Sequence, residues 1–297
     1  MKEKITDIFM KCIIALAGLI LLGLSLYALR YSYLFPVEYL EIATPQKDSV
    51  WKTVVGAAAL FFLLLLVSYG IRQVNYRKQK LLQAGIPFRE NEPLAAHCTF
   101  KIGGPAQLFV QPQTEQQLCS AAALCKEQAA RYYLLGNGSN ILFADEGFAG
   151  VVIDISALGS DIAVEGNMLT AGAGVRLAAL CRAALEHGLS GLEFAYGIPG
   201  TVGGAVYMNA GAYGGEMKDV LTVVRYLTAE GEVVQASAAE LDLSYRHSIF
   251  EENGGCILSA QFALQPGNAA DIRAKMDELM AKRVDKQPLD KPSAGST

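Results

Sequence analysis

Residues 197–215 read GIPGTVGGAVYMNAGAYGG, and seven of these nineteen positions are glycine. Average glycine usage of about 7% predicts only one or two in a stretch of this length. A flexible linker is one interpretation, but linkers are rich in serine and other polar residues. Here glycine alternates with residues that favour burial, such as Ile198, Val202 and Met208. We therefore expect a packed, glycine-lined surface that lets a large ligand approach the backbone.

A second glycine loop lies upstream, where residues 136–140 read GNGSN after a short apolar strand expected at residues 132–135. Successive bare amides make a concave site for an anion and would suit a pyrophosphate. Asn-Gly is also the strongest two-residue hairpin signal, so a plain turn stays open for this loop alone. The P-loop motif is absent, and Gly172-Ala173-Gly174 lacks the third glycine of the dinucleotide fingerprint. These absences argue against a Rossmann domain.

The surrounding residues alternate between strand and helix patterns. Thr114 to Gln117 form a capping box, which predicts the start of a helix. Gly166-Asn167 and Glu230-Gly231 mark tight turns between pairs of strands. This alternation predicts an α+β fold with mixed sheets. We expect helices after Thr114, at 177–187 and at 272–287, and strands at 132–135, 151–155, 162–164, 168–170, 221–227, 232–235 and 256–264.

The N-terminal 80 residues differ in composition from the rest of the chain. Residues 12–29 and 54–71 are two uncharged apolar segments, each about 18 residues long, at the short end of what spans a bilayer. They predict a membrane region with two transmembrane helices. Lysines and arginines precede the first segment and follow the second, so the positive-inside rule places both ends in the cytoplasm. The globular part is then expected to be cytoplasmic.

Charge and cysteine content exclude other classes of protein. The net charge is -4 and the sequence has no basic stripe with interleaved aromatics, so we expect no nucleic-acid partner. The six cysteines form no C-x-x-C pair, and no histidine stands at metal-ligand spacing from them. We interpret the cysteines as reduced, buried side chains and expect no metal.

Five motifs occur in one order along the chain: PLAAHCTFKIGGPA at 93–106, LGNGSNIL at 135–142, GIPGTVGGAVYMNAGAYG at 197–214, SYRHSIF at 244–250 and PSAGST at 292–297. Together they resemble the UDP-N-acetylenolpyruvoylglucosamine reductase (MurB) family over residues 85–297. The resemblance implies an FAD-binding fold of the vanillyl-alcohol-oxidase (PCMH) type in two lobes at 85–266. A substrate-binding domain would begin at 267–297.

The resemblance also implies an activity and a set of site residues. In the family, NADPH reduces FAD, and hydride passes to UDP-N-acetylglucosamine enolpyruvate to give UDP-N-acetylmuramate, a peptidoglycan precursor. The substrate is therefore expected to be a nucleotide sugar. The residues that match the family's FAD-binding segments are Gly136, Asn137, Gly138, Ser139, Asn140, Gly197, Ile198, Pro199, Gly200, Gly203, Gly204, Asn209, Gly211 and Tyr213.

Two residues match catalytic positions of the family. Arg246 matches the arginine that stabilises the developing enolate, a role suited to a fixed cation. Ser296 matches the serine that protonates the intermediate carbon. Tyr245 and Arg246 are expected to contact the substrate. The plainer alternatives are a surface salt bridge for Arg246 and a frayed terminal position for Ser296.

The sequence departs from the family in two places. The family continues beyond the Ala-Gly-Ser motif into a domain that supplies a catalytic glutamate, so we expect a shortened chain with little turnover. Members of the family are ordinarily soluble, so the apolar N-terminal segments are a second departure. Two other functions stay open: a different FAD-linked oxidase of the same fold, and a non-catalytic, membrane-anchored flavin-binding protein.

Overall fold

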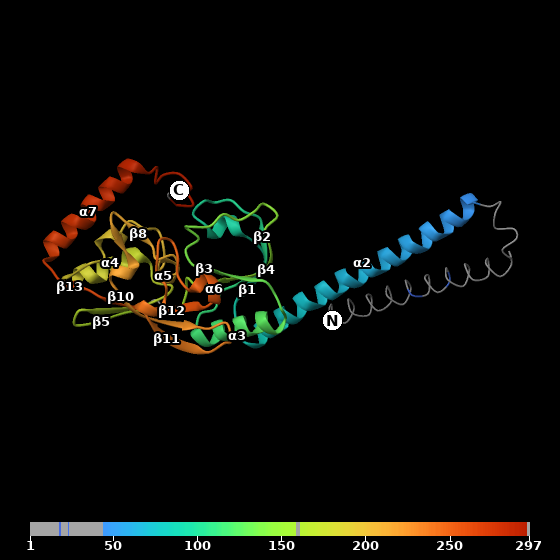
Figure 1. The fold of residues 1–297 in the computed structure, drawn as a ribbon, viewed down its shortest axis with the longest axis horizontal. Coiled ribbons are helices and arrows are strands. Elements are labelled where there is room, and N and C mark those ends of the chain that lie inside the picture. Colours follow the sequence, from blue (N-terminus) through green and yellow to red (C-terminus); the bar gives the residue numbers. More distant parts are fainter. Residues whose placement is uncertain (1–17, 19–22, 24–43, 159–160, 296–297) are drawn as a thin grey trace. The chain divides into compact units, whose positions relative to one another are not determined.

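The structure is a computed structural model that describes residues 18, 23, 44–158 and 161–295. The chain divides into two units, residues 1–79 and residues 80–297, which are described separately (Figure 1).

The first unit contains most of helix α2 (Thr44–Gln83). Within its segment Val55–Gln83, the most apolar stretch of 18 residues has a mean hydropathy of 2.0, and only 6% of that stretch is buried. Large apolar side chains such as Phe62 and Leu66 are more than half exposed. Among the described residues, one helix is long enough and apolar enough to cross a membrane, and it is α2. The sequence predicted two such helices. The other expected span, residues 12–29, lies outside the described residues except for positions 18 and 23.

The second unit begins with a mixed four-stranded sheet in the order β1-β2-β4-β3. Strands β2 (Pro105–Val110), β4 (Phe148–Asp154) and β3 (Tyr132–Leu135) are parallel, and β1 (Phe88–Pro93) pairs antiparallel with β2. Helix α3 (Glu115–Glu127) connects β2 to β3. We call this sheet with α3 the first lobe.

The second lobe is an antiparallel sheet in the order β11-β10-β12-β6-β5. Figure 1 shows β11 and β12 of this sheet in orange. The strands are β5 (Ile162–Glu165), β6 (Met168–Gly172), β10 (Leu221–Leu227), β11 (Val233–Ser237) and β12 (Cys256–Ala263). The helices are α4 (Leu177–Glu186), α5 (Val202–Tyr207), α6 (Phe250–Asn253) and α7 (Ala269–Lys286). Two short strand pairs complete it: β7 (Leu189–Ser190) with β13 (Gln265–Pro266), and β8 (Gly211–Ala212) with β9 (Gly215–Glu216).

Local sequence signals account for several of these elements. The Thr114 hydroxyl accepts a hydrogen bond from the Gln117 amide at 3.2 Å, which confirms the expected start of α3. The sequence predicts an apolar face on α4, and all five of its residues are buried: Leu177, Leu180, Cys181, Ala184 and Leu185. Gly188 follows that helix with φ +64°. The apolar face predicted for α3 comprises Leu118, Ala122, Cys125 and Ala129, and it is partly wrong because Ala129 lies beyond the helix in a left-handed conformation with φ +45°.

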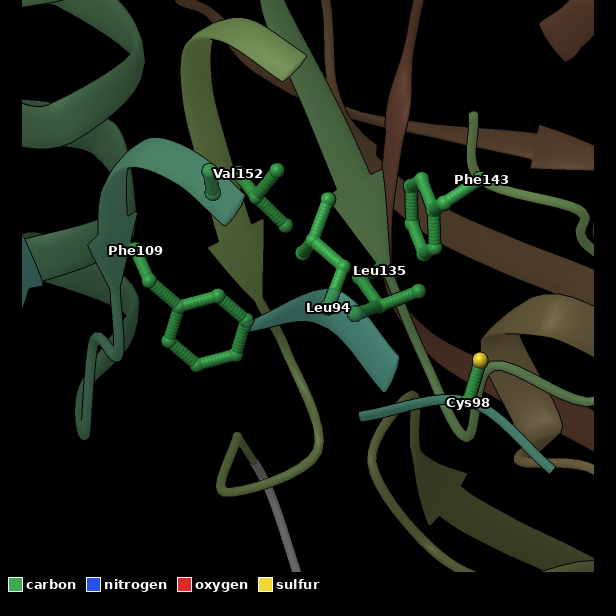
Figure 2. Packing of buried hydrophobic residues seen from close by; sticks show 7 residues of the cluster. Leu94, Cys98, Phe109, Leu135, Phe143 and Val152 are labelled. Atoms are coloured by element: carbon green, nitrogen blue, oxygen red, sulfur yellow. The ribbon is translucent and has the colours of Figure 1, made fainter. Parts of the chain in front are cut away.

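The core of the first lobe lies directly beneath the 136–140 loop. Leu94, Phe109, Leu135 and Val152 are almost fully buried and pack in one cluster with Cys98 (Figure 2). Leu135 is the last residue of β3, so the loop leaves the sheet from a position that the core fixes.

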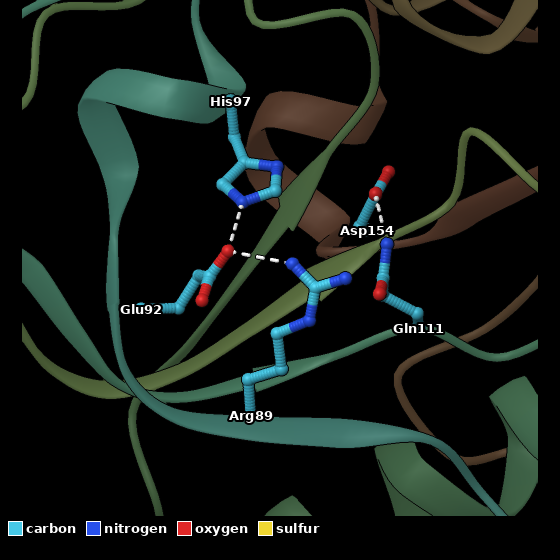
Figure 3. A network of polar contacts seen from close by, with 5 residues as sticks. All are labelled: Arg89, Glu92, His97, Gln111 and Asp154. Atoms are coloured by element: carbon cyan, nitrogen blue, oxygen red, sulfur yellow. Dashed lines mark hydrogen bonds and ion pairs between the residues drawn. The ribbon is translucent and has the colours of Figure 1, made fainter.

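A polar network holds the chain next to this core (Figure 3). Arg89 Nη1 donates to Glu92 Oε1 at 2.7 Å, and His97 Nε2 lies 2.8 Å from the same oxygen. The His97 ring packs on Phe109, with 4.0 Å between ring centroids. These contacts fix the 3-10 helix η2 (Leu94–His97) against β1 and β2. The backbone of His97 and Cys98 is thereby placed under the 136–140 loop.

The two lobes are joined by a bidentate ion pair. Arg225 on β10 donates to both carboxylate oxygens of Glu115 on α3, each at 2.6 Å. Both side chains are more than one third exposed, so water screens much of the attraction. The pair orients α3 relative to the second sheet more than it stabilises the fold.

Candidate active site

A cavity of about 370 Å³ lies between the lobes. Its volume falls within the range of about 300–1,000 Å³ usual for small-molecule and cofactor sites. The 136–140 loop forms one wall, α5 and the loop before it form the second, and residues 254–257 at the start of β12 form the third. The structure thus brings the two glycine-rich stretches together from opposite lobes.

The 136–140 loop presents unused backbone donors to this cavity. Across the part of the chain that the structure describes, the amides of residues 137–140 make no hydrogen bond. Gly138 has φ +63°, and a Cβ there would lie 2.2 Å from the His97 carbonyl oxygen. The glycine therefore allows the loop to turn tightly over η2 while its neighbouring amides stay free. Four successive free amides form the kind of concave site that binds an anion.

The second stretch contributes shape instead of donors. The Val202 and Gly203 amides donate to the carbonyls of Val175 and Ala173, and the Gly204 amide donates to the Thr201 hydroxyl. The N-terminus of α5 therefore has its amides satisfied within the protein. A Cβ at Gly136 would lie 2.7 Å from Thr201 Oγ1, so the two stretches are in close contact there. Asn137 Nδ2 also donates to the Pro199 carbonyl.

Aromatic side chains form the apolar walls. Tyr132, Tyr133 and Tyr207 line the cavity, and each residue is 36–40% exposed. Burial raises the pKa of Tyr133, and Tyr207 raises it further. Burial also raises the pKa of Tyr207, with a smaller contribution from Glu251. Flat, neutral walls of this kind suit a conjugated ring system.

Two charged side chains, Arg246 and Glu251, are among the residues that line the cavity. Arg246 lies in a tight turn, with a left-handed backbone at φ +57°. Its guanidinium makes no ion pair or hydrogen bond with any described residue. Next to it, His247 Nδ1 lies 3.3 Å from Glu251 Oε2, and Glu251 and then Asp242 raise the pKa of His247. A free cation thus faces a cavity with anion-binding amides on its other side.

The residues expected from the sequence fall into three groups. Six of them lie outside the cavity lining: Gly197 packs against Arg283, Asn209 is only 2% exposed, Gly211 pairs with Glu216, Pro199 and Tyr213 are exposed, and Tyr245 is 85% exposed. Ser296 lies outside the described residues, and the preceding Ser293 donates from its amide to the Thr99 carbonyl. Those that line the cavity are Gly136, Asn137, Gly138, Ser139, Asn140, Ile198, Gly200, Gly203, Gly204 and Arg246.

Several lining residues were not expected from the sequence. The tyrosines of β3 come from a strand that was predicted, but nothing in its pattern indicated that their rings face a cavity. The segment from Phe250 to Ile257 also lines it. Its signal in the sequence is Gly254-Gly255, where a helix ends with φ +65° and β12 begins.

Comparisons with known proteins agree with this geometry. A family model described as an FAD binding domain matches residues 106–237, which run from β2 to β11. The UDP-N-acetylenolpyruvoylglucosamine reductase of Agathobacter rectalis is 48% identical over 233 residues, covering 74% of this chain and 73% of the relative. The enzyme of the same name from Clostridioides difficile is 45% identical over 207 residues, covering 70% of this chain and 68% of the relative.

Solved structures support the same fold. The crystal structure of UDP-N-acetylenolpyruvylglucosamine reductase (MurB) from Thermus caldophilus superposes with a TM-score of 0.59 at 33% identity, covering 71% of this chain and 73% of that one. A BBE-like 1 protein from Physcomitrella patens, at 20% identity and a TM-score of 0.51, shares the fold alone. The expected FAD-binding fold is confirmed by these matches. The chain therefore belongs to the UDP-N-acetylenolpyruvoylglucosamine reductase family of flavin-dependent oxidoreductases.

Proposed function

We propose that this chain binds FAD in the cavity between its lobes and reduces UDP-N-acetylglucosamine enolpyruvate to UDP-N-acetylmuramate for peptidoglycan synthesis, with NADPH as the reductant. The observation that carries the proposal is the row of four free amides in a loop that lines an apolar cavity, in a chain 45% and 48% identical to two named reductases. Bound FAD supplies hydride transfer between the nicotinamide and the enolpyruvyl group. The preference for NADPH comes from the family.

The residues present fit this cofactor. The free amides of residues 137–140 would hold the pyrophosphate, where their partial positive charges offset its negative charge. An added Cβ at Gly200 or Gly204 would meet no atom closer than 3.4 Å, so these two glycines leave room for a flat ring, whereas Gly203 packs against Ala173. Tyr133 and Tyr207 would pack on that ring. Of the other residues matched to the family, Gly197, Pro199, Gly211 and Tyr213 would contact it only if they moved toward the cavity.

Arg246 would hold the negative charge of the substrate. Its planar guanidinium can donate two parallel hydrogen bonds to a carboxylate. A fixed cation beside the reacting group stabilises the charge that develops on the enolate. Tyr245, the neighbour of Arg246, is exposed and would contact the substrate from the rim. Ser296 would protonate the adjacent carbon.

The experiment is an anaerobic assay of the full chain, purified in detergent and reconstituted with FAD. NADPH should bleach the flavin, and UDP-N-acetylglucosamine enolpyruvate should then restore its absorbance in a single turnover, which is followed because little steady-state turnover is expected. Arg246→Lys should slow this restoration by roughly 10²-fold, the scale of losing one stabilising donor. Arg182→Lys, on the exposed face of α4, is the matched control and should retain the wild-type rate.

Each alternative function has its own result in this assay. Oxygen consumption with simple alcohols, without response to the enolpyruvyl nucleotide, would support a different oxidase of this fold. Stable flavin binding without any reduction would support a non-catalytic protein. No flavin absorbance after reconstitution would remove the cofactor from the proposal.

We propose that residues 54–71 of α2, together with residues 12–29, anchor the chain in a bilayer. Support comes from the exposed apolar side chains of α2 and from the basic residues that follow residue 71. The second unit would then face the cytoplasm. Leu63→Lys with Val67→Lys should release the chain from membranes in a flotation assay, because each lysine costs roughly 3 kcal/mol at a span centre. Gln83→Lys, at the end of α2, is the control and should leave the chain membrane-bound.

A further inference from the structure

We propose that Asn209 is a positioning residue that holds the Arg246 turn in place and does not contact the cofactor. The inference rests on the proposed function, in which Arg246 acts on the substrate. Asn209 lies at the end of the glycine-rich stretch that forms one wall of the cavity, and Arg246 lies on a separate segment 37 positions later. The contacts between these segments carry the inference.

The Arg246 turn has little support of its own. Ser244 and His247 exchange two backbone hydrogen bonds of 3.2 Å each, which places Tyr245 and Arg246 at the corner. Arg246 has a left-handed backbone, which an arginine adopts only when its surroundings enforce it. The side chains of both corner residues are exposed. The position of the guanidinium therefore depends on whatever holds the base of the turn.

The Asn209 side chain holds that base. Its Nδ2 donates to the Ser244 carbonyl at 2.9 Å and to Glu216 Oε2 at 2.8 Å. Its Oδ1 accepts from the Lys218 amide at 2.9 Å. The residue is 2% exposed, and both amide protons and the carbonyl oxygen are used. A buried carboxamide with every group satisfied is a rigid link between three segments.

A second contact fixes the other end of the turn. Ser248 is fully buried and donates from its hydroxyl to the Tyr207 carbonyl at 2.6 Å. Tyr207 is the last residue of α5 and lines the cavity. The turn is therefore attached at residues 244 and 248 to residues 207–209, directly behind the cavity wall. A shift of this wall would move the guanidinium with it.

The helix end at Asn209 offers a clean substitution. The Asn209 and Ala210 amides donate to the carbonyls of Val206 and Ala205, and Asn209 has φ +39°. This is the helix ending in which glycine is the commonest residue. Asn209→Gly should therefore keep the backbone and remove only the side-chain bonds. Asn209→Asp is a second variant of the same size, which places a carboxylate against the Ser244 carbonyl and Glu216.

The end of α3 provides the matched control. Ala129 and Ala130 donate to the carbonyls of Lys126 and Cys125, and Ala129 has φ +45°. The helix ending is the same, but the Ala129 side chain is exposed and has no polar group. Ala129→Gly reproduces the backbone change of Asn209→Gly without touching the Arg246 turn.

Wild type and variants of the full chain, each reconstituted with FAD, are compared in three measurements: FAD affinity, the rate of flavin reoxidation and hydrogen exchange. Asn209→Gly should bind FAD within about twofold of wild type, and flavin reoxidation by the enolpyruvyl nucleotide should slow by about 10- to 100-fold, the scale of a misplacement of about 1 Å. In an Arg246→Ala background the same change should alter that rate by less than about twofold. Hydrogen exchange at the Ser244 and His247 amides should rise about tenfold or more in Asn209→Gly. Ala129→Gly should match wild type throughout.

The outcomes separate the two proposals. A wild-type rate for Arg246→Ala alone overturns the proposed role of Arg246. A loss for Arg246→Ala with a wild-type rate for Asn209→Gly overturns the positioning role alone. A full additional loss from Asn209→Gly in the Arg246→Ala background also overturns it, because Asn209 would then act independently. Unchanged exchange at the turn overturns it without reference to activity.

Discussion

Gly138 is the position at which one methyl group should disturb the site most. Its φ of +63° lies in the left-handed region, and an added Cβ would lie 2.2 Å from the His97 carbonyl oxygen and 2.7 Å from Cys98 Cα. Both neighbours belong to backbone that the Glu92 contacts and the first-lobe core hold in place. Gly138→Ala therefore forces either η2 or the 136–140 loop to move.

The size of the effect follows from two contributions. The left-handed backbone costs alanine about 1–2 kcal/mol, and forcing a methyl group into a packed site costs about 1–3 kcal/mol more. Gly166 is the control that isolates the backbone contribution from the packing contribution. It has φ +59°, but an added Cβ there meets nothing within 4 Å. We expect Gly138→Ala to lower the free energy of unfolding by about 2–5 kcal/mol, and Gly166→Ala by about 1–2 kcal/mol.

Differential scanning calorimetry of the full chain in detergent measures this difference. Because 1 kcal/mol shifts the Tm of a domain of this size by roughly 2–4 °C, Gly138→Ala should lower Tm by about 4–20 °C, and Gly166→Ala by about 2–8 °C. Gly138→Ala should also weaken FAD binding, since the loop amides move with the backbone. Equal Tm values for the two variants, with equal FAD affinity, would refute the close approach of the loop to η2.

Three further predictions concern single side chains. Thr114→Ala removes the hydroxyl that caps α3 and should lower the free energy of unfolding by about 0.5–2 kcal/mol in urea titrations, with an unchanged m-value. His247 has its pKa raised above 6.5, chiefly by Glu251, so its stabilising effect is fully present below pH 6.5 and disappears as pH rises through the higher folded-state pKa. The Tm difference between wild type and His247→Gln should therefore shrink as pH rises, and a constant difference would contradict the ion pair. Burial raises the pKa of Cys256 to about 12, so iodoacetamide should modify this thiol by mass spectrometry only after unfolding.

The sequence predicted elements wherever the signal was local. The stripe of α4, the Thr114 cap and the β5–β6 hairpin each depend on residues within a few positions of one another, and all three are present. Strands β1 and β2 were not predicted. Strand β1 reads FRENEP, which is polar and carries no alternation, and it forms because β2 supplies its partner. A strand that forms because of a partner elsewhere in the sequence cannot be predicted from the alternation of its own residues.

The candidate site was only partly predictable for a related reason. Glycine content located the two stretches that face the cavity, but it did not separate glycines that open space from glycines that pack against backbone. An added Cβ at Gly138 would lie 2.2 Å from the His97 carbonyl oxygen, whereas one at Gly204 would meet only Thr201 Oγ1 at 3.4 Å. Asn209 stands within the same motif, yet its side chain points into a buried hydrogen-bond network instead of the cavity. Such roles depend on the direction of a side chain, which the order of residues does not give.

Each lobe is built from one uninterrupted stretch of chain, residues 88–154 for the first sheet and 162–263 for the second. Each lobe can therefore form its own sheet independently of the other. The first lobe carries the amides of residues 137–140, and the second carries the cavity wall formed by α5. A ligand that binds both lobes stabilises the state in which the lobes are packed together. At a ligand concentration 100 times its Kd, this stabilisation is about 2.7 kcal/mol. In calorimetry, the flavin-free chain should therefore show a broad unfolding transition that approaches two overlapping transitions. The flavin-loaded chain should show one sharp transition.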